Sequence, residues 1–336
     1  MTTAEPDPAT APEDGLEITV LICTRNRAAQ LGNVLESVTR LRVPTGLRWE
    51  LLIVDNGSSD NTGEVVQGFA SRLPVRVVRE ETPGLSNARN RGVAEARGRY
   101  ICWTDDDVVI DEGWLAAYAE AFQAHPEAIV FGGRIIPVLE PPTPAWFSHL
   151  VRFQPLASLV AMRDFGDGPT PLDIGSGVTP WGANYAVRTA EQLGQLYDPG
   201  LGVSPLQKRL SEETDVMHRM LRDGAEGWWA PAALVRHIYP PHRQTLSYVF
   251  NYFTALGESV RYMHARPAMP GEPTDGVEIR SSWFTVLRSY VLAWINSALF
   301  GVTWLLGAKR QGLGFLKSAG YHVGVARYSA ASLRRR

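Results

Sequence analysis

Short apolar runs alternate with helix-patterned segments through the first third of the chain. The expected strands cover residues 18–23, 50–54, 75–78 and 100–103, and the expected helices cover residues 26–41, 60–69 and 85–96. Apolar runs of this length are typical of strands covered on both faces, and repeated strand–helix units predict a mostly parallel sheet with right-handed crossovers. The expected fold class is therefore α/β.

Polar clusters follow three of these expected strands. They are Thr24-Arg25-Asn26-Arg27, the segment of residues 55–60 that begins with Asp55, and Asp105-Asp106-Asp107. The carboxyl ends of parallel strands share one edge of a sheet, and ligands bind at that edge in folds of this class. We therefore expect the three clusters to line one site.

The aspartate triplet requires a compensating cation, because adjacent carboxylates repel one another. Mg²⁺ and Mn²⁺ prefer carboxylate oxygens and keep coordination positions open for phosphate, so a divalent metal that carries a polyphosphate fits the cluster. A solvated acidic turn is the alternative for an isolated triplet. Neither a Walker-type loop nor a Gly-x-Gly-x-x-Gly loop follows the first strand, which disfavours an ATPase and a nicotinamide dehydrogenase.

Charge and composition exclude other classes. The 336-residue chain has a formal net charge of −2, whereas a nucleic-acid binder needs a basic surplus, so no nucleic-acid partner is expected. Cys23 and Cys102 each lie in an apolar run and are expected to be buried thiols in a reducing compartment. Residues 1–15 lack the basic start and apolar stretch of a signal peptide, so a disordered tail on a cytoplasmic protein is expected.

Four blocks of the sequence together resemble glycosyltransferase family 2. They are residues 20–27 (VLICTRNR), 52–60 (LIVDNGSSD), 83–90 (PGLSNARN) and the aspartate triplet, in the family's order. The resemblance implies the GT-A fold, a Rossmann-like domain that uses nucleoside-diphosphate sugars together with Mg²⁺ or Mn²⁺. The expected division is a tail at residues 1–15, a GT-A domain at 16–245 and a helical C-terminal region at 246–336.

The resemblance also implies which residues bind the nucleotide. An aspartate after the second strand would accept a hydrogen bond from the N–H of a uracil ring, which favours a UDP-sugar, although Asp55 could instead cap the following helix. Arg89 is placed near this pocket, but it could equally be a solvated helix residue. The residues expected to line the nucleotide pocket are Thr24, Arg25, Asp55, Gly84 and Asn90.

The metal and diphosphate positions follow from the same resemblance. Asp105 and Asp106 are expected to contact the nucleotide, with Asp105 facing the ribose or the metal, and Asp107 would coordinate a metal that bridges the two phosphates. His237 lies where related enzymes place a further metal ligand, although a histidine at a strand end is often structural. Arg243 could contact the diphosphate, because a guanidinium binds phosphate in a bidentate manner.

A second acidic cluster, residues 211–215, opens an amphipathic helix. In the family, an acidic pair at this place carries the general base that deprotonates the acceptor hydroxyl. The pair is Glu-Glu rather than the usual Glu-Asp, so Glu213 is the expected base and Asp215 is the alternative, while Glu212 is assigned to the acceptor side. Acids that only complement the helix dipole are the competing interpretation. A base of this kind favours direct displacement with inversion at the anomeric carbon.

The segment Trp181-Gly182-Ala183-Asn184 resembles the family's acceptor loop. Glycine permits a close approach, the Asn184 amide can bond sugar hydroxyls, and the Trp181 indole can stack on a pyranose ring. A structural turn with a packed tryptophan is the alternative.

The C-terminal region carries a long uncharged segment. No charged residue occurs in the twenty positions between Arg288 and Lys309, and at about 1.5 Å per residue such a helix could span a bilayer core of about 30 Å. A single crossing would place the basic tail outside, against the preference of basic segments for the cytoplasm. An interfacial helix, or a hairpin returning through residues 313–325, fits better, and the basic tail would then meet anionic lipid. A core or dimer helix is the alternative.

The chain is therefore expected to be a metal-dependent, inverting glycosyltransferase at the cytoplasmic face of the cell membrane. Its acceptor could be a lipid-linked or cell-envelope glycan, another glycan or a small molecule. A nucleotidyltransferase is one alternative, but residues 24–27 lack the glycines of its loop. A catalytically silent sugar-nucleotide or lipid-binding scaffold is another, and the intact triplet together with Glu212 and Glu213 counts against it.

Overall fold

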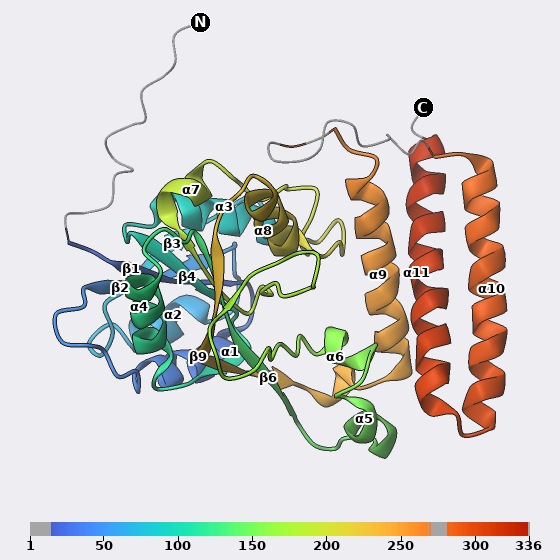
Figure 1. The fold of residues 1–336 in the computed structure, drawn as a ribbon, viewed down its shortest axis with the longest axis horizontal. Helices are drawn as coiled ribbons and strands as arrows, with labels where there is room; N and C mark the ends of the chain where they lie inside the picture. The colour runs from blue at the N-terminus through green and yellow to red at the C-terminus, as the bar shows by residue number, and fades with distance from the viewer. Residues whose placement is uncertain (1–14, 268, 270–280, 335–336) are drawn as a thin grey trace, which may run out of the picture. The chain divides into compact units, whose positions relative to one another are not determined.

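The computed structural model of the protein describes residues 15–267, 269 and 281–334, and the chain forms two compact units (Figure 1). The expected N-terminal tail, residues 1–15, lies outside the described residues except for Gly15. The first unit consists of Met1–Ile136, Arg163–Pro205 and Glu212–His237, and the second consists of Pro137–Met162, Leu206–Ser211 and Ile238–Arg336.

The first unit begins with the alternation of strands and helices that the sequence predicts. The strands Ile18–Thr24, Trp49–Asp55 and Tyr100–Thr104 are apolar and largely buried, as in a sheet covered on both faces, whereas the edge strand Val75–Arg79 is only partly buried. The helix Ala28–Val38 buries one apolar stripe. The prediction of strand–helix units is confirmed. The elements are β1 (Ile18–Thr24), α1 (Ala28–Val38), β2 (Trp49–Asp55), α2 (Thr62–Gln67), β3 (Val75–Arg79), α3 (Leu85–Glu95) and β4 (Tyr100–Thr104).

The rest of the first unit adds antiparallel strands and short helices. Within residues 140–180, the short helices α5 and α6 belong to the second unit, whereas β7 belongs to the first. The remaining elements before the C-terminal helices are β5 (Val108–Ile110), α4 (Trp114–Ala124), β6 (Val130–Leu139), α5 (Ala145–Leu150), α6 (Leu156–Leu159), β7 (Thr170–Pro171), β8 (Asn184–Arg188), α7 (Thr189–Leu193), α8 (Glu212–Arg222) and β9 (Gly227–Tyr239).

These strands form one mixed sheet. Its order is β3-β2-β1-β4-β8-β6-β9-β5, with β7 paired to β9. The pairs β2–β3, β1–β2 and β1–β4 are parallel, whereas β4–β8, β6–β8 and β5–β9 are antiparallel. The expected parallel sheet is therefore correct for the first four strands, and the later strands make the sheet mixed.

The direction of strand order reverses at β1. The chain moves outward from β1 to β2 and β3 and then returns to place β4 on the other side of β1. Right-handed crossovers therefore put α1 and α2 on one face of the sheet and α3 on the other (Figure 1). The strand order therefore switches direction between β1 and β4, and the carboxyl ends of strands at such a switch point are the position where sheets of this kind bind ligands.

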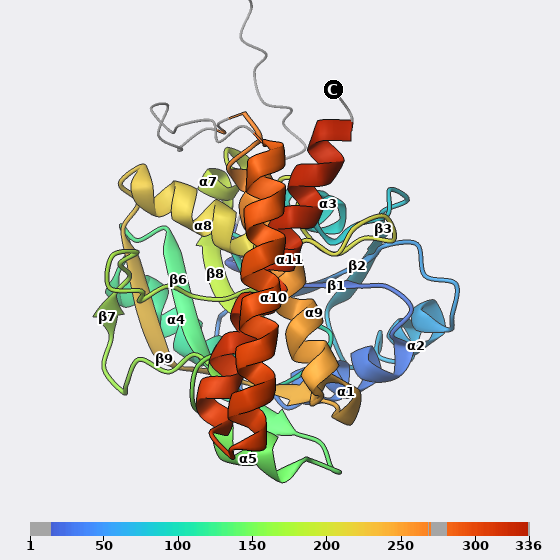
Figure 2. The same cartoon turned by 90° about the vertical axis from the view of Figure 1, so that its right-hand side faces the viewer.

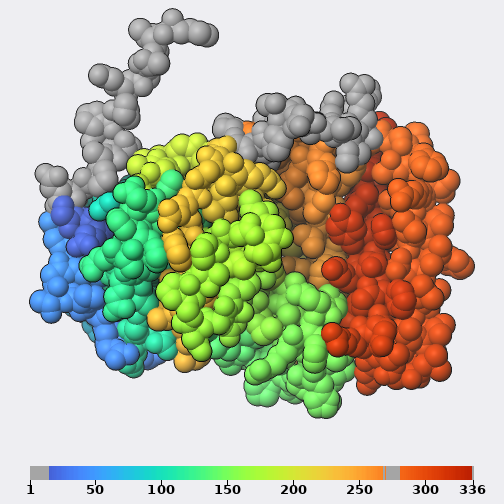
Figure 3. All heavy atoms as spheres, in the orientation of Figure 1, coloured from blue at the N-terminus to red at the C-terminus, as the bar shows by residue number. Residues whose placement is uncertain are grey.

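The second unit is built on three long helices. They are α9 (Leu246–Met263), α10 (Trp283–Leu305) and α11 (Lys309–Arg334), preceded by the short helix η2 (Pro241–Arg243). Helix α11 lies between α9 and α10 (Figures 1 and 3). Apolar residues of α5, α6, α9 and α11 form a separate core around Phe147, Leu156 and Phe253.

Glycines let α9 and α11 approach closely. A Cβ added at Gly257 would overlap the Tyr321 backbone, and one added at Gly320 or Gly324 would overlap carbonyl oxygens of α9. Small residues spaced four apart are a common means of bringing two helix backbones into contact. This contact therefore fixes α11 against α9.

Helix α10 is packed on one side only. It lies against α11 (Figure 2), and it is long and apolar enough to cross a membrane by length and composition, with 23 residues and a mean hydropathy of 1.2. Only 17% of its apolar window is buried. That low burial disfavours the alternative in which α10 is a core helix of this chain.

Replacing Gly324 with alanine is expected to destabilise the helical unit, because the new methyl group must displace the α9 backbone. Overpacking of this kind costs about 1–3 kcal/mol. Gly314→Ala is the matched control on the same helix: a Cβ there meets nothing within 4 Å, and the better helix propensity of alanine adds up to about 1 kcal/mol. Urea unfolding followed by circular dichroism gives both free energies of unfolding. Shifts of the same sign for the two variants would contradict the close contact.

Candidate active site

The carboxyl ends of β1 and β4 lie side by side because of their register. Ile22 pairs with Thr104, so the two residues that follow on each strand reach the same level. There the Thr24 hydroxyl donates a hydrogen bond of 2.8 Å to Asp106 Oδ2. Two of the expected polar clusters therefore meet, as the sequence predicts.

The side chain of Arg27 holds the far part of the aspartate triplet. Its guanidinium forms ion pairs with Asp106 and with Asp107, the latter at 2.8 Å between Nη2 and Oδ2. No role was predicted for Arg27 from the sequence, although this residue belongs to the first polar cluster. The arginine supplies a cation that adjacent carboxylates need.

Both carboxylate oxygens of Asp106 accept hydrogen bonds from other residues of the protein. One carboxylate oxygen accepts from Thr24 and the other from Arg27, and the residue is buried. Burial raises the pKa of Asp106 to about 7, although Arg27 opposes the shift. The expectation that Asp106 contacts the nucleotide is therefore corrected: its carboxylate holds the turn together.

Asp107 and His237 lie together because β5 and β9 pair with Val108 opposite His237. His237 Nε2 is 3.3 Å from Asp107 Oδ1, and both side chains are almost buried. Among the described residues, no three His, Cys, Asp or Glu side chains converge as a metal-binding group. A carboxylate and an imidazole nevertheless fit a divalent ion such as Mg²⁺, which proteins often bind through one or two carboxylates together with substrate phosphates and water.

Arg89 forms ion pairs with acidic residues from two other segments of the site. Its side chain is only 4% exposed, and its Nη1 lies 2.8 Å from Glu212 Oε1 and 3.5 Å from Glu213 Oε2. Its Nη2 lies 3.6 Å from Asp105 Oδ1. Asp105, expected at the ribose or the metal, therefore shares a guanidinium with the acidic pair.

The alternative in which Arg89 is a solvated helix residue is wrong. The buried residues of α3 are Ser86, Ala88, Arg89, Gly92 and Val93, and the Arg89 guanidinium also lies 5.5 Å from the centre of the Tyr197 ring. The position of Arg89 between apolar residues three and four apart was the available signal. A charged residue on an apolar stripe requires a buried partner.

The two glutamates of α8 differ in exposure. Glu212 is buried, and burial together with the neighbouring Glu213 raises the pKa of Glu212 to about 8, with Arg89 opposing the shift. Glu213 keeps 18% of its side chain exposed. Asp215 is buried in an ion pair with Arg219, 3.3 Å from Oδ2 to Nε. Of the two candidate bases, Glu213 is thus the one that solvent reaches.

The expected acceptor loop lies against Glu213. Thr104 of β4 pairs with Asn184 of β8, and the Thr104 hydroxyl donates to the Ala183 carbonyl at 3.0 Å. A Cβ added at Gly182 would lie 3.0 Å from the Glu213 carboxyl group. The Trp181 ring is covered on one side by the Arg163 guanidinium, 3.7 Å from the ring centre. The glycine therefore leaves room for the glutamate.

Asn184 has a structural role, which corrects the expectation that it bonds a sugar. It is fully buried, and its Oδ1 accepts from Trp114 Nε1 and from the Tyr118 hydroxyl, each at 2.8 Å. Its Nδ2 donates to the carbonyls of Arg134 at 2.9 Å and Ala233 at 2.7 Å. The amide has no capacity left for a ligand.

The expected nucleotide pocket is organised by Asn56, which the sequence analysis did not single out. Its Oδ1 accepts from the Gly84 N–H at 2.8 Å, and its carbonyl accepts from Arg25 Nη1 at 3.0 Å. Gly84 has φ +137°, a conformation that favours glycine. Asp55 lies beside Asn56 at the end of β2, and its Oδ1 accepts from the Ser58 N–H at 2.8 Å.

Two other expected residues stand apart from this group. The Asn90 amide is bonded to both backbone groups of Tyr197, at 2.9 and 2.8 Å, so it anchors that loop and is corrected from a nucleotide contact to a positioning residue. Arg243 belongs to the second unit, in η2, and its assignment to the diphosphate remains an expectation.

Comparison with known proteins shows what this chain is similar to. The profile of glycosyl transferase family 2 matches residues 19–174. Succinoglycan biosynthesis protein ExoM of Rhizobium meliloti is 25% identical over 248 residues, which cover 71% of this chain and 72% of that protein. Poly-β-1,6-N-acetyl-D-glucosamine synthase of Staphylococcus epidermidis is 32% identical over 111 residues, 33% of this chain but only 26% of that protein.

Solved structures show the same fold. Mannosyltransferase PcManGT from Pyrobaculum calidifontis, in complex with GDP-Man and Mn²⁺, has a TM-score of 0.56 and 17% identity, covering 97% of this chain and 90% of that one. S. aureus TarS 1–349 has a TM-score of 0.52 and 14% identity, covering 96% and 92%. The fold is therefore GT-A, as the sequence predicts.

Arg89→Leu is expected to lower the free energy of unfolding by about 3–5 kcal/mol, because it leaves a cluster of carboxylates without its buried cation. Adding Glu212→Gln to this variant should restore part of the loss, since one buried charge is then removed. Guanidinium unfolding of the single and double variants measures both effects. Arg79→Leu, which removes an exposed pair with Asp55 and Glu81, is the control and should change stability by less than about 1 kcal/mol. An equally small effect at Arg89 would contradict its central role.

Proposed function

Because this chain belongs to glycosyltransferase family 2, we propose that it transfers a sugar from a nucleoside-diphosphate sugar to an acceptor hydroxyl, with a divalent metal and with inversion. The observation that carries the proposal is the pair of acidic groups joined through Arg89. Asp105 of the triplet and Glu213 of α8 both contact this guanidinium, so a donor site and a base lie within one charge network.

Glu213 is proposed as the general base. Glu213 is one of the two glutamates at the start of α8, and its side chain remains partly exposed to solvent. It lies against Gly182 of the acceptor loop. The carboxylate would take the proton of the acceptor hydroxyl while that oxygen forms its bond to the anomeric carbon and the bond to the diphosphate breaks. Displacement in one step inverts the configuration at that carbon.

Glu212 and Arg89 support this base but do not themselves take up the proton of the acceptor hydroxyl. The Arg89 guanidinium is the cationic partner of the Glu213 carboxylate, at 3.5 Å, and Glu212 completes the pairing of the guanidinium. Both are therefore positioning residues. Trp181 would offer its remaining face to the acceptor sugar, since Arg163 covers the other one.

Asp107 and His237 are proposed to hold the metal, with Asp105 nearby. The bound ion would act as a Lewis acid that stabilises the charge developing on the diphosphate leaving group. The Mn²⁺ complexes of PcManGT and of GalNAc-T7 support a divalent ion, with Mg²⁺ and Mn²⁺ as the candidates. Arg27 already balances Asp107, and it is the described cation best placed to contact an incoming phosphate.

The donor is proposed to be a UDP-sugar. Asp55 at the end of β2 can accept the N–H of a uracil ring, and TarS, a neighbour in fold, has been solved with UDP. Similarity to the succinoglycan biosynthesis protein ExoM and to poly-β-1,6-N-acetyl-D-glucosamine synthase favours a cell-envelope or exported glycan as acceptor. Such acceptors, including lipid-linked ones, suit a protein at the cytoplasmic face of the membrane.

Glu213→Gln is expected to lower kcat by about 10²–10⁴-fold, the usual contribution of a general base, while nucleotide affinity stays unchanged. The substitution removes the proton acceptor but keeps the shape of the side chain beside Gly182. Release of the nucleoside diphosphate in the presence of acceptor measures the rate, and calorimetry measures affinity. Asp223→Asn, at the exposed far end of α8, is the matched control. Retained turnover in Glu213→Gln would transfer the role of base to another acid.

Metal-dependent nucleotide binding tests the donor site directly. Calorimetric titration of UDP, GDP and dTDP, each with and without Mn²⁺, should show binding of one nucleotide that requires the metal. Asp107→Ala should abolish the metal requirement together with most of the affinity, because a principal metal ligand is lost. Asp167→Ala removes an exposed carboxylate and should bind as the unmodified protein does. No binding by the folded protein would contradict the proposed donor site.

A further inference from the structure

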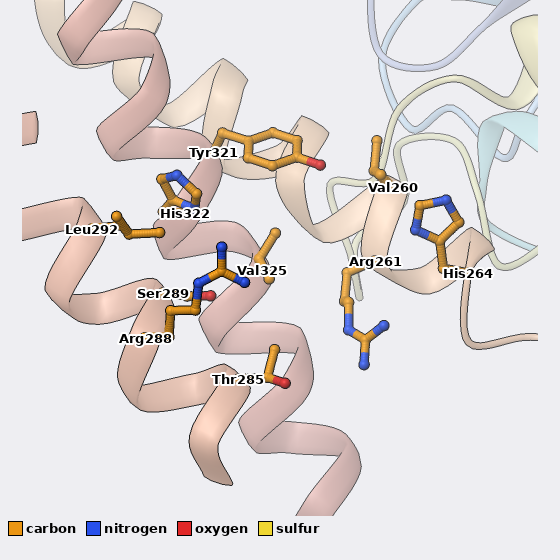
Figure 4. Close-up of a pocket in the computed structure, with 10 residues that line it drawn as sticks. All are labelled: Val260, Arg261, His264, Thr285, Arg288, Ser289, Leu292, Tyr321, His322 and Val325. Atoms are coloured by element: carbon orange, nitrogen blue, oxygen red, sulfur yellow. The ribbon is translucent and has the colours of Figure 1, made fainter. Parts of the chain in front are cut away.

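A second candidate site lies in the helical unit. A cavity of about 230 Å³ is lined by residues from the end of α9 and from α10 and α11 (Figure 4). Pockets that enclose whole drug-sized ligands measure about 300–1,000 Å³. This cavity therefore suits a smaller group than a sugar nucleotide.

The lining of this cavity is basic. Arg261, His264, Arg288 and His322 contribute to it, together with the hydroxyl of Tyr321. Within the part of the chain that the structure describes, no carboxylate lines the cavity, and neither Arg261 nor Arg288 forms an ion pair. An anion would supply the missing negative charge.

Two of these side chains converge from neighbouring helices. Arg288 of α10 and His322 of α11 both point into the space between their helices (Figure 4). Burial, and then the nearby Arg288 charge, lower the pKa of His322, so its imidazole is neutral and can donate one hydrogen bond. Arg261 is buried and held by Ser329 at 3.1 Å and Ser281 at 3.2 Å, which fixes the rear of the cavity.

The cavity borders the exposed apolar side of α10. Phe284, Val291 and Ile295 lie four residues before and three and seven residues after Arg288, on the same side of the helix, and they are 74%, 48% and 40% exposed. The exposed Leu287 lies beside Phe284 and Val291 on this stripe. Large exposed apolar stripes with aromatic residues mark membrane or protein contacts. The basic cavity and the apolar stripe therefore belong to one surface.

Charge favours a membrane over a second copy of the chain as the partner of this surface. The sequence after Glu278 contains no acidic residue, and α10 and α11 carry Arg288, Lys309, Arg310, Lys317 and Arg327. A two-fold contact through α10 would bring the same basic residues face to face, because a symmetric interface repeats its charges. The cytoplasmic leaflet is anionic and attracts such residues.

We propose that the cavity binds the phosphate of a membrane phospholipid while the apolar side of α10 lies in the interface of the bilayer. The Arg288 guanidinium makes the principal contact with the phosphate oxygens, and His322 donates a hydrogen bond beside it. Helix α10 is thus a membrane anchor with a specific headgroup site. This inference concerns attachment and does not depend on the proposed transfer reaction.

The test is co-sedimentation of the full chain with vesicles of phosphatidylcholine alone or mixed with phosphatidylglycerol. The unmodified protein should bind the mixed vesicles. Arg288→Gln should weaken this binding about tenfold or more, as expected for the loss of a charge-assisted contact. Lys309→Gln, which removes the same charge from an exposed residue outside the cavity, should weaken it by no more than about fivefold. Equal losses in the two variants would overturn the headgroup site.

Further measurements distinguish a lipid headgroup from free phosphate and from a second copy of the chain as the binding partner. Arg288→Lys keeps the charge and loses the bidentate fork, so an intermediate affinity supports the site even if Arg288→Gln is poorly folded. Calorimetry with inorganic phosphate should show no binding without vesicles, and phosphate binding that Arg288→Gln abolishes would overturn the lipid assignment. Sedimentation velocity should show no dimer that Leu287→Glu disrupts, and such a dimer would assign the α10 stripe to a second copy. No nucleotide is present, so these outcomes are independent of the donor site.

Discussion

The buried guanidinium of Arg89 is the interaction on which the site depends. A charge with 4% exposure is stable only when acids surround it, and here the acids come from two distant segments, Asp105 after β4 and the Glu212–Glu213 pair of α8. Each carboxylate in turn needs the cation, because like charges at this spacing repel one another. The ends of a strand and a helix are therefore held together by electrostatics as well as by packing.

A second arginine divides the aspartate triplet. Arg27 pairs with Asp106 and Asp107, whereas Asp105 turns to Arg89, so neighbouring carboxylates have different partners. This division explains how adjacent acids coexist at the end of a buried strand. It also gives them different roles: Asp106 is committed to the turn, while Asp107 lies beside His237 at the position proposed for the metal.

The two units rely on different physical interactions. The first is a mixed sheet whose strand ends position charged groups, whereas the second is a helical unit whose contact between α9 and α11 depends on glycines such as Gly324. Helix α10 buries little of its apolar surface within this unit. A surface of that kind is stable in water only when something covers it, and the neighbouring basic cavity indicates an anionic partner.

Local features could be predicted from the sequence. They are the alternation of the first strands and helices, the polar clusters at the ends of those strands, and the acidic residues in the first turn of α8. These follow from residues close together in the chain. The antiparallel half of the sheet, the burial of Arg89 and the structural role of Asn184 could be seen only in the tertiary structure. The hydrogen-bond partners of Asn184, for example, lie 49 to 70 positions away in the sequence. A polar side chain has the same local sequence pattern whether it faces a ligand or a buried partner, because the packing of distant strands and helices, such as α4 against Asn184, is what brings that partner within hydrogen-bonding distance.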